Sequence, residues 1–470
     1  MRQTNFAMSV IAAAVLAVLA GCGGSTGADQ TLTNKYSAQV SFGDSLSDVG
    51  TYAVGPVAAL GGGKFNINGN NTAINPALTG KNWTELMAVQ FGLAPPCAAQ
   101  TGLDGGPGGF NVAVVNHAGC FGYAQGGARV TNPVGPGNKA TGVARGDLTV
   151  PVVTQIQNHL RFVGGKFNGD EIVFVMAGGN DALIQLASLS AGATAAGQAA
   201  GAAEGARVGG ATFATTLVGL LAAGATDPAT AAQAIGLALA TENARPGHTD
   251  QSVVGAAVGT AAAQPGNQAV GAPAVYGPMV VQAQAAAAAA GTAAGAAAGA
   301  KAGADFAAAN GPNAVLAMAT AGAELVALVK TQLVAKGASK VVVNNLPDIA
   351  TTPSGLAQSA QTQQLIVAMV KAFNDQLNAG LSTEANVLLV DVFTLSHDQA
   401  TNPGPFGLTN VKDAACAENP LGNSLGCNGT NLIPGDVSHY AFADSVHPTP
   451  FNYLLLARYV SKVMVVRGWL

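Results

Sequence analysis

Two histidines near the end of the chain each follow an aspartate by three residues, as Asp436-Val-Ser-His439 and Asp444-Ser-Val-His447. With this spacing, one turn of chain can bring the carboxylate to the imidazole Nδ1, which sets the tautomer and leaves Nε2 free to act as a base. A serine hydroxyl is a poor nucleophile until such a base removes its proton. Both pairs therefore indicate nucleophilic catalysis by a serine elsewhere in the chain.

Two serines are candidates for that nucleophile. Ser45 lies in Gly43-Asp44-Ser45-Leu46, directly after an apolar run, and open α/β sheets bind ligands at the carboxyl ends of their strands. Ser424 lies in Gly422-Asn423-Ser424-Leu425-Gly426, which matches the Gly-x-Ser-x-Gly turn of other serine hydrolases. That turn requires a buried strand before the serine, whereas the residues on both sides of Ser424 are polar and rich in turn formers. Ser45 is therefore the predicted nucleophile.

The sequence around Ser45 resembles the nucleophile block of the GDSL, or SGNH, family of esterases and lipases. Further blocks of that family follow in order: Gly126-Gly127-Ala128, Gly178-Gly179-Asn180-Asp181 and Asp444-Ser445-Val446-His447-Pro448. The resemblance covers about residues 38–189 and 313–470. It implies a carboxylic ester hydrolase with a three-layer α/β/α, flavodoxin-like fold, and it implies no cofactor.

The resemblance also distinguishes between the two aspartate-histidine pairs. Asp444 and His447 are similar to the family's orienting acid and base, because only this pair precedes a proline and a final helix. Asp436 and His439 are then expected to be surface loop residues. Ser45 would attack an ester carbonyl, and the acyl-enzyme would be hydrolysed by water.

Three donors of an oxyanion hole are implied in the same way. They are the backbone N–H groups of Ser45 and Gly127 and the side-chain amide of Asn180, with Gly126 as a one-residue alternative to Gly127. A tetrahedral oxyanion needs fixed donors of this kind, each worth roughly 3–4 kcal/mol. An amide side chain suits the role because it donates without titrating.

The elements that must position these residues are short strands alternating with helices, which is typical of a parallel sheet covered on both faces. About five strands are predicted, over Ala38–Phe42, Val112–Val115, Glu171–Met176, Lys340–Asn344 and Asn386–Val392. Helices are predicted over Lys81–Phe91, Ala323–Ala335, Gln361–Leu377 and Phe451–Val466. The hydrolase domain thus comprises residues 35–189 and 313–470.

Residues 190–312 form an Ala/Gly-rich insert between these two parts. Glycine recurs there at every fourth position in two runs: Gly197, Gly201, Gly205, Gly209 and Gly291, Gly295, Gly299, Gly303. This step keeps the glycines near one helix face, where a second backbone can approach, so the runs predict an antiparallel helix pair. We expect the pair to form a wall or lid over the acyl site. A low-complexity, floppy insert and an anchoring or partner-binding role are the alternatives.

The N-terminal residues indicate export. Residues 1–21 have a charged start and a short apolar run, which is typical of a signal peptide, and they end in Leu19-Ala20-Gly21-Cys22. This ending resembles a bacterial lipobox, in which Cys22 carries the lipid; an ordinary cleaved signal is the alternative. Residues 22–34 then form a flexible tether. The absence of Asp after Cys22 is compatible with an outer-membrane lipoprotein, held to the membrane by its lipid anchor.

The net charge of the chain and the spacing of its ligand-type residues limit the possible partners. The chain has 470 residues, with 20 Lys+Arg and 24 Asp+Glu, a net charge of -4 that argues against binding nucleic acid. No spacing of ligand residues predicts a metal site.

Export makes disulfides the expected state of the other cysteines. Three pairings are possible, and sequence proximity favours Cys97–Cys120 and Cys416–Cys427.

Two other functions are compatible with these features. Some relatives that share the blocks resemble lipid acyltransferases, so the acyl group would then pass to an alcohol acceptor instead of water. The chain would otherwise be a surface interaction lipoprotein on an inactive esterase scaffold, although the intact blocks disfavour this. In each enzymatic case the substrate is an acyl ester, whose chain length and alcohol part the sequence leaves open.

Overall fold

The computed structural model describes residues 34–69 and 80–470. At its centre is a parallel sheet in the order β1-β4-β5-β6. Its strands are β1 Gln39–Gly43, β4 Ile172–Met176, β5 Val341–Asn344 and β6 Val387–Val390. Every residue of β1, β4 and β5 is buried, which explains why these strands are continuous apolar runs. The predicted leader, Cys22 and the tether as far as residue 33 lie outside the described residues.

The prediction for Val112–Val115 is wrong in one respect, because this strand does not join the central sheet. It lies in β3 Asn111–Asn116, which is mostly exposed and pairs antiparallel with β2 Gln100–Asp104. Instead, residues 121–125 run beside β1 and exchange backbone hydrogen bonds of 2.8–3.1 Å with it. The sheet therefore has four assigned strands, not about five. Valines favour a strand, but they do not specify the strand with which it pairs.

Helices cover both faces of the sheet, so the domain has three layers. Val173, Val175 and Val343 pack toward one set of helices, and Ile172, Phe174 and Val342 toward the other. The first set is α4 Val152–Phe162, α10 Ala360–Leu381 and the end of α8 Pro273–Leu328. The second set is α3 Trp83–Gln90, α11 Val392–Thr401 and α12 Pro450–Arg467. The remaining short elements are α2 Gly55–Ala59, α9 Pro353–Leu356, β7 Asn410–Ala414 and β8 Tyr440–Phe442.

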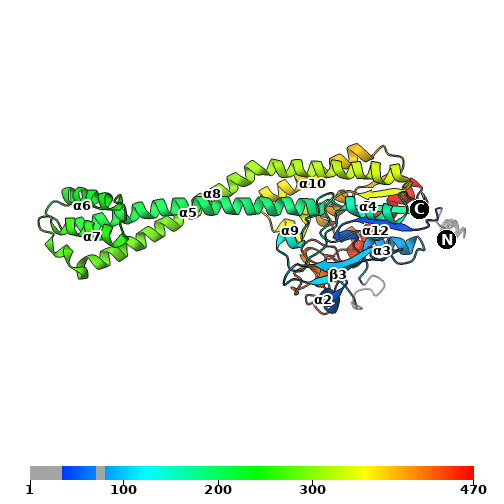
Figure 1. The fold of residues 1–470 in the computed structure, drawn as a ribbon, viewed down its shortest axis with the longest axis horizontal. Coiled ribbons are helices and arrows are strands. Elements are labelled where there is room, and N and C mark those ends of the chain that lie inside the picture. The colour runs from blue at the N-terminus through cyan, green and yellow to red at the C-terminus, as the bar shows by residue number, and fades with distance from the viewer. Residues whose placement is uncertain (1–33, 70–79) are drawn as a thin grey trace, which may run out of the picture.

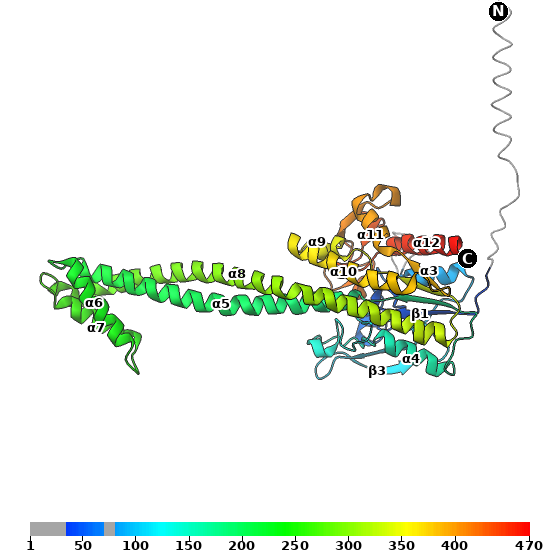
Figure 2. The same ribbon diagram turned by 90° about the horizontal axis from the view of Figure 1, so that it is seen from above.

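The insert forms a long helical hairpin that projects from this domain (Figures 1 and 2). Helix α5 Gly179–Ala222 leads outward, and α8 returns beside it. A Cβ on Gly201 would lie 2.8 Å from the carbonyl oxygen of Gly295, and one on Gly295 would lie 2.7 Å from that of Gly201. The glycines therefore face one another across the pair, as their spacing predicts.

The far end of the hairpin has a small hydrophobic core of its own. Helices α6 Pro228–Asn243 and α7 Asp250–Ala262 pack there against the end of α5 and the start of α8. The central residues of this core include Leu217, Ile235 and Val258. We call this unit, residues 223–272 with the helix ends that it covers, the tip.

Two of the described helices are long and apolar enough to cross a membrane: Gly179–Ala222 and Pro273–Lys336. Length and composition alone are weak evidence, because core helices of soluble proteins meet the same criterion. Both helices also extend into the hydrolase domain, since α5 begins and the C-terminal part of α8 ends among its core residues. The predicted insert at 190–312 is thus continuous with α5 and α8, which extend into the domain.

Candidate active site

Ser45 lies immediately beyond the carboxyl end of β1, where a short 3₁₀ turn over Ser45–Ser47 begins. Asp44 caps this turn, and its carboxylate accepts a hydrogen bond of 3.1 Å from the Leu46 N–H. Burial raises the pKa of Asp44 to about 7, although this N–H and the nearby His447 act in the opposite direction. The turn directs Ser45 toward residues from the end of the chain, and the serine is 8% exposed.

A chain of hydrogen bonds joins Ser45 to the second aspartate-histidine pair. The Ser45 Oγ lies 2.9 Å from His447 Nε2, and His447 Nδ1 lies 2.7 Å from Asp444 Oδ2. Ser45 and His447 are 402 residues apart in the sequence. Burial opposes the charge on Asp444, but His447 and the backbone N–H groups outweigh it and hold the pKa of this carboxyl well below its usual value. Asp444 can therefore orient the imidazole of His447, and this imidazole can accept the proton of Ser45.

The other candidates do not take part in this chain. The Asp436 carboxylate accepts a hydrogen bond from the Ser438 N–H at 2.9 Å, and the ring of the exposed His439 packs at a tilt against Phe451, with centroids 4.3 Å apart. Ser424 is completely buried, and its hydroxyl makes no hydrogen bond with any described residue. The structure thus brings Ser45 and His447 together and leaves the Ser424 hydroxyl and His439 outside the arrangement.

Three polar groups border the space in front of Ser45. Gly127 has φ +77°, which favours glycine, and no described residue accepts its N–H or that of Ser45. The neighbouring Gly126 N–H instead donates to Asp48 Oδ2 at 2.9 Å. The Asn180 amide donates one hydrogen bond of 2.9 Å to the Ala128 carbonyl and has a second N–H left. Because the Gly126 N–H already has an acceptor and the Gly127 N–H has none among the described residues, Gly127 is favoured over Gly126 as an oxyanion donor.

Two aspartates that bind backbone groups near these donors were not assigned a role from the sequence. Asp48 accepts hydrogen bonds from three backbone N–H groups, those of Gly50, Thr51 and Gly126, and burial raises its pKa to about 6. Asp181 accepts from Arg129 Nε at 2.9 Å and from the Val130 N–H at 3.1 Å. Asp48 lies two residues after the block that contains Ser45, and Asp181 is the last residue of the block that contains Asn180; these positions are the signal that the sequence offers.

A cavity of about 490 Å³ opens beside Ser45, Gly127 and Asn180. Most of its wall is apolar, with side chains that include Leu46, Leu183, Leu346, Ile349, Val392, Leu395, Val411, Leu421, Phe442 and Leu456. None of its lining residues belongs to the insert at 190–312. Most of the insert projects away from the cavity, because α5 begins at the site and leads outward (Figure 2). Ser190, Ala193 and Ala307 at its base line an adjoining pocket that shares Leu183 and Ile349 with the cavity, so the role of a wall or lid stays a prediction.

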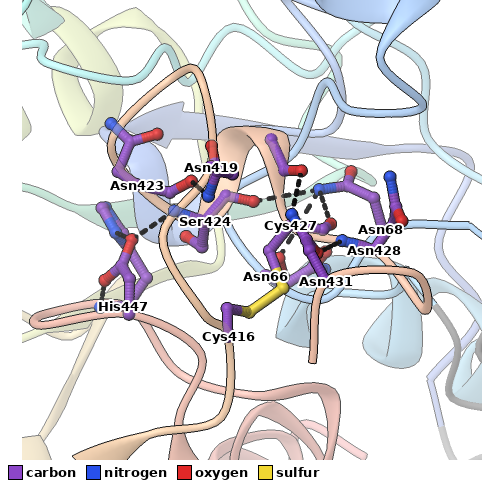
Figure 3. The surroundings of a disulfide bond; sticks show 12 residues. Asn66, Asn68, Cys416, Asn419, Asn423, Ser424, Cys427, Asn428, Asn431 and His447 are labelled. Atoms are coloured by element: carbon purple, nitrogen blue, oxygen red, sulfur yellow. Dashed lines mark hydrogen bonds and ion pairs between the residues drawn. A yellow bond between two sulfur atoms is a disulfide. The ribbon is translucent and has the colours of Figure 1, made fainter. Parts of the chain in front are cut away.

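Both cysteine pairs favoured by proximity are disulfides. Cys97–Cys120 has a Cα separation of 5.0 Å, and Cys416–Cys427 has one of 6.0 Å. Cys416–Cys427 lies in the neighbourhood of His447 (Figure 3). Among the described residues, no group of three or more His, Cys, Asp or Glu side chains is arranged to hold a metal ion.

Part of the chain is similar in sequence to known esterases and lipases. No family model matches the sequence. Two GDSL esterase/lipases of Arabidopsis thaliana are each 24% identical to it, over 133 and 155 residues, or 26% and 30% of this chain. Esterase EstA of Pseudomonas aeruginosa is 32% identical over 133 residues. The similarity is to GDSL hydrolases.

These matches span a limited part of each relative. The chain covers 37% and 41% of the two plant proteins and 19% of Esterase EstA. At this identity and coverage, the similarities support a GDSL-type hydrolase and suggest activity on esters. The sheet with helices on both faces is compatible with that assignment.

Proposed function

We propose that the chain is a serine carboxylic ester hydrolase that works through an acyl-enzyme on Ser45. The observation that carries this proposal is the chain of hydrogen bonds from Ser45 through His447 to Asp444, at 2.9 and 2.7 Å. A nucleophile, a base and an orienting acid in this order are the parts that acyl transfer to serine requires.

In the proposed reaction, Ser45 Oγ attacks the ester carbonyl carbon while His447 Nε2 takes the hydroxyl proton. The N–H groups of Ser45 and Gly127 and the free N–H of Asn180 stabilise the oxyanion. The C–O bond to the alcohol then breaks, and His447 returns the proton to the leaving oxygen. Water repeats these steps on the acyl-enzyme, which releases the acid and regenerates Ser45.

The cavity indicates which half of the ester it binds. Its wall is mainly aliphatic and aromatic, and such surfaces bind apolar groups by removing them from water. We therefore propose that an apolar acyl chain occupies it, while the alcohol leaves toward solvent. Arg145 and Asp147 also line it, and they form an ion pair with each other.

The proposal is tested by hydrolysis of nitrophenyl esters of increasing chain length. We expect Ser45→Ala and His447→Ala to lose at least a thousandfold in kcat, with His439→Ala close to the native protein as the matched histidine control. A fluorophosphonate probe should label Ser45 in the native chain. Turnover that persists in Ser45→Ala, or labelling of Ser424 instead, would contradict the assignment.

A further inference from the structure

The loop closed by Cys416–Cys427 carries Ser424 close to His447 (Figure 3) and contacts the Asp444 carboxylate. Within this loop the Ser424 backbone N–H donates to Asp444 Oδ2 at 2.6 Å. The other N–H donors to this carboxylate are those of Val446 and His447, which belong to the same turn as Asp444. Among the described residues, Ser424 is thus the one donor that reaches Asp444 from a separate segment.

The two carboxylate oxygens of Asp444 have different partners. Oδ1 accepts the N–H groups of Val446 and His447 at 2.8 and 2.7 Å, whereas Oδ2 accepts His447 Nδ1 and the Ser424 N–H. Donors at both oxygens oppose rotation of the carboxylate. Because Oδ2 is the oxygen that holds the imidazole, the Ser424 N–H bears directly on the direction in which His447 Nε2 points.

The loop holds Ser424 by its backbone and not by its side chain. The hydroxyl has no hydrogen-bond partner among the described residues, although the serine is fully buried. Its carbonyl accepts from Asn68 Nδ2 at 3.1 Å, and the same amide donates to the Cys427 carbonyl at 3.0 Å. Asn423 caps the short turn Ser424–Gly426 by accepting the Leu425 N–H. The disulfide and Asn68 therefore determine where the Ser424 N–H lies.

We propose that Ser424 is a positioning residue, whose backbone N–H orients the Asp444 carboxylate, and that the Cys416–Cys427 loop holds this N–H in place. The inference rests on the proposed esterase function and adds a part to its machinery. The same loop contributes Leu421 and Asn423 to the cavity wall, so it joins the acyl site to the base.

The decisive variant is Ser424→Pro, which removes the N–H. Ser424 is the first residue of its 3₁₀ turn, a position where proline is tolerated, and Asn423 before it is extended, which avoids the helical conformation that a following proline disfavours. Ser424→Ala is the reference for loss of the hydroxyl. Because the proline ring also places its Cδ where the N–H meets Asp444 Oδ2, the cysteine variants below separate loss of the donor from displacement of the carboxylate. A hydrogen bond to a charged group is worth about 1.5–3 kcal/mol, so kcat of the proline variant should be roughly 10- to 100-fold below that of the alanine variant, with similar KM.

Two results would overturn the inference: equal kcat in the two variants, or a rise in KM with kcat unchanged, which would indicate only a disturbed cavity wall. The proton resonance of His447 Nδ1 supplies a readout that does not depend on turnover. It should be far downfield in the alanine variant and should move upfield in the proline variant. If the native chain hydrolyses no ester, the proposed function fails, while this resonance still decides whether Ser424 positions Asp444.

If Ser424→Pro does not fold, a pair of cysteine variants carries the test. Cys416→Ser with Cys427→Ser releases the loop, and Cys97→Ser with Cys120→Ser removes the other disulfide as the matched control. We expect the His447 Nδ1 resonance to shift and kcat to fall about tenfold more in the first protein than in the second. Equal behaviour of the two proteins would overturn the inference.

Discussion

At the scale of single residues, burial has different consequences for three carboxyls near Ser45. Asp44 and Asp48 are buried without a cationic partner, and their pKa values are raised to about 7 and about 6. Asp444 is also buried, yet its pKa is lowered, because His447 and backbone N–H groups stabilise its charge. The site thus holds an ionised carboxylate where the imidazole needs one, beside two that are protonated more readily.

His159 is a buried residue outside the proposed machinery. It is 1% exposed, neither ring nitrogen has a hydrogen-bond partner among the described residues, and the rings of Phe42, Phe121, Tyr123 and Phe167 surround it. Burial lowers its pKa to about 4, against a usual value of 6.5. The folded state therefore binds its proton less readily than the unfolded state does.

We predict that His159 makes the protein less stable in acid. Its contribution to the free energy of unfolding is fully present above pH 6.5 and is lost as the pH falls toward 4, by about 3 kcal/mol in total. His159→Leu should therefore lose less stability between pH 7 and pH 4 than the native protein. Urea unfolding at several pH values measures this difference, and parallel pH curves for the two proteins would contradict it.

At the scale of elements, close backbone approach holds the α5–α8 hairpin together. The facing surfaces lack side chains at the glycines, so the helices gain packing contacts that offset the low helix propensity of glycine. The first turn of α5 also contains Asn180, so one 44-residue helix joins the proposed oxyanion hole to the tip. A Cβ on Gly210, in contrast to Gly201, would meet no atom within 4 Å.

This contrast supplies a matched pair of substitutions. Gly201→Leu should separate the two helices, because its side chain would meet the Gly295 backbone. Gly210→Leu should leave the pair closed and raise its helix propensity by roughly 1 kcal/mol. Limited proteolysis and the distance between spin labels on α5 and α8 measure the separation. Similar digestion of both variants would show that the glycines do not hold the pair.

At the scale of the whole molecule, the hydrolase domain and the tip have separate cores (Figure 1). The cavity is lined by residues of the hydrolase domain alone. We predict that replacing residues 211–285 by a short turn, which leaves the facing glycines of α5 and α8 paired, keeps kcat/KM within about twofold for short and long acyl esters. The shortened chain must first be shown to fold. A changed chain-length profile would show that the tip acts on substrate selection.

We also propose that Cys22 anchors the chain to a bacterial outer membrane through a lipid, on the basis of the Leu19-Ala20-Gly21-Cys22 sequence. Cys22→Ser should then release the protein from the membrane fraction and reduce its mass by that of the lipid. Ser45→Ala, made in the same strain, controls for loss of activity, because it should stay in the membrane fraction. Unchanged mass and fractionation of Cys22→Ser would exclude the anchor.

The sequence by itself determined the features that depend on neighbours a few residues apart. The glycine face of the insert helices and the central strands of the sheet follow from short-range spacing and periodicity. Spacing also offered Asp444 and His447 as one of two aspartate-histidine pairs, and the family resemblance chose between them. The short separation of Cys416 and Cys427 likewise favoured the disulfide that the structure has. Spacing of this kind is a property of the chain before it folds.

Only the tertiary structure decided the relations between distant segments. The contact of Ser45 with His447, the use of the Gly126 N–H by Asp48 and the donation from Ser424 to Asp444 depend on how loops pack after folding. The same is true of Val112–Val115, whose place in the central sheet was predicted wrongly, and of the insert, most of which projects away from the cavity. The pattern of apolar residues along the chain predicts which side chains are buried. The hydrophobic effect is non-directional, however, so it does not by itself specify which segments pack together.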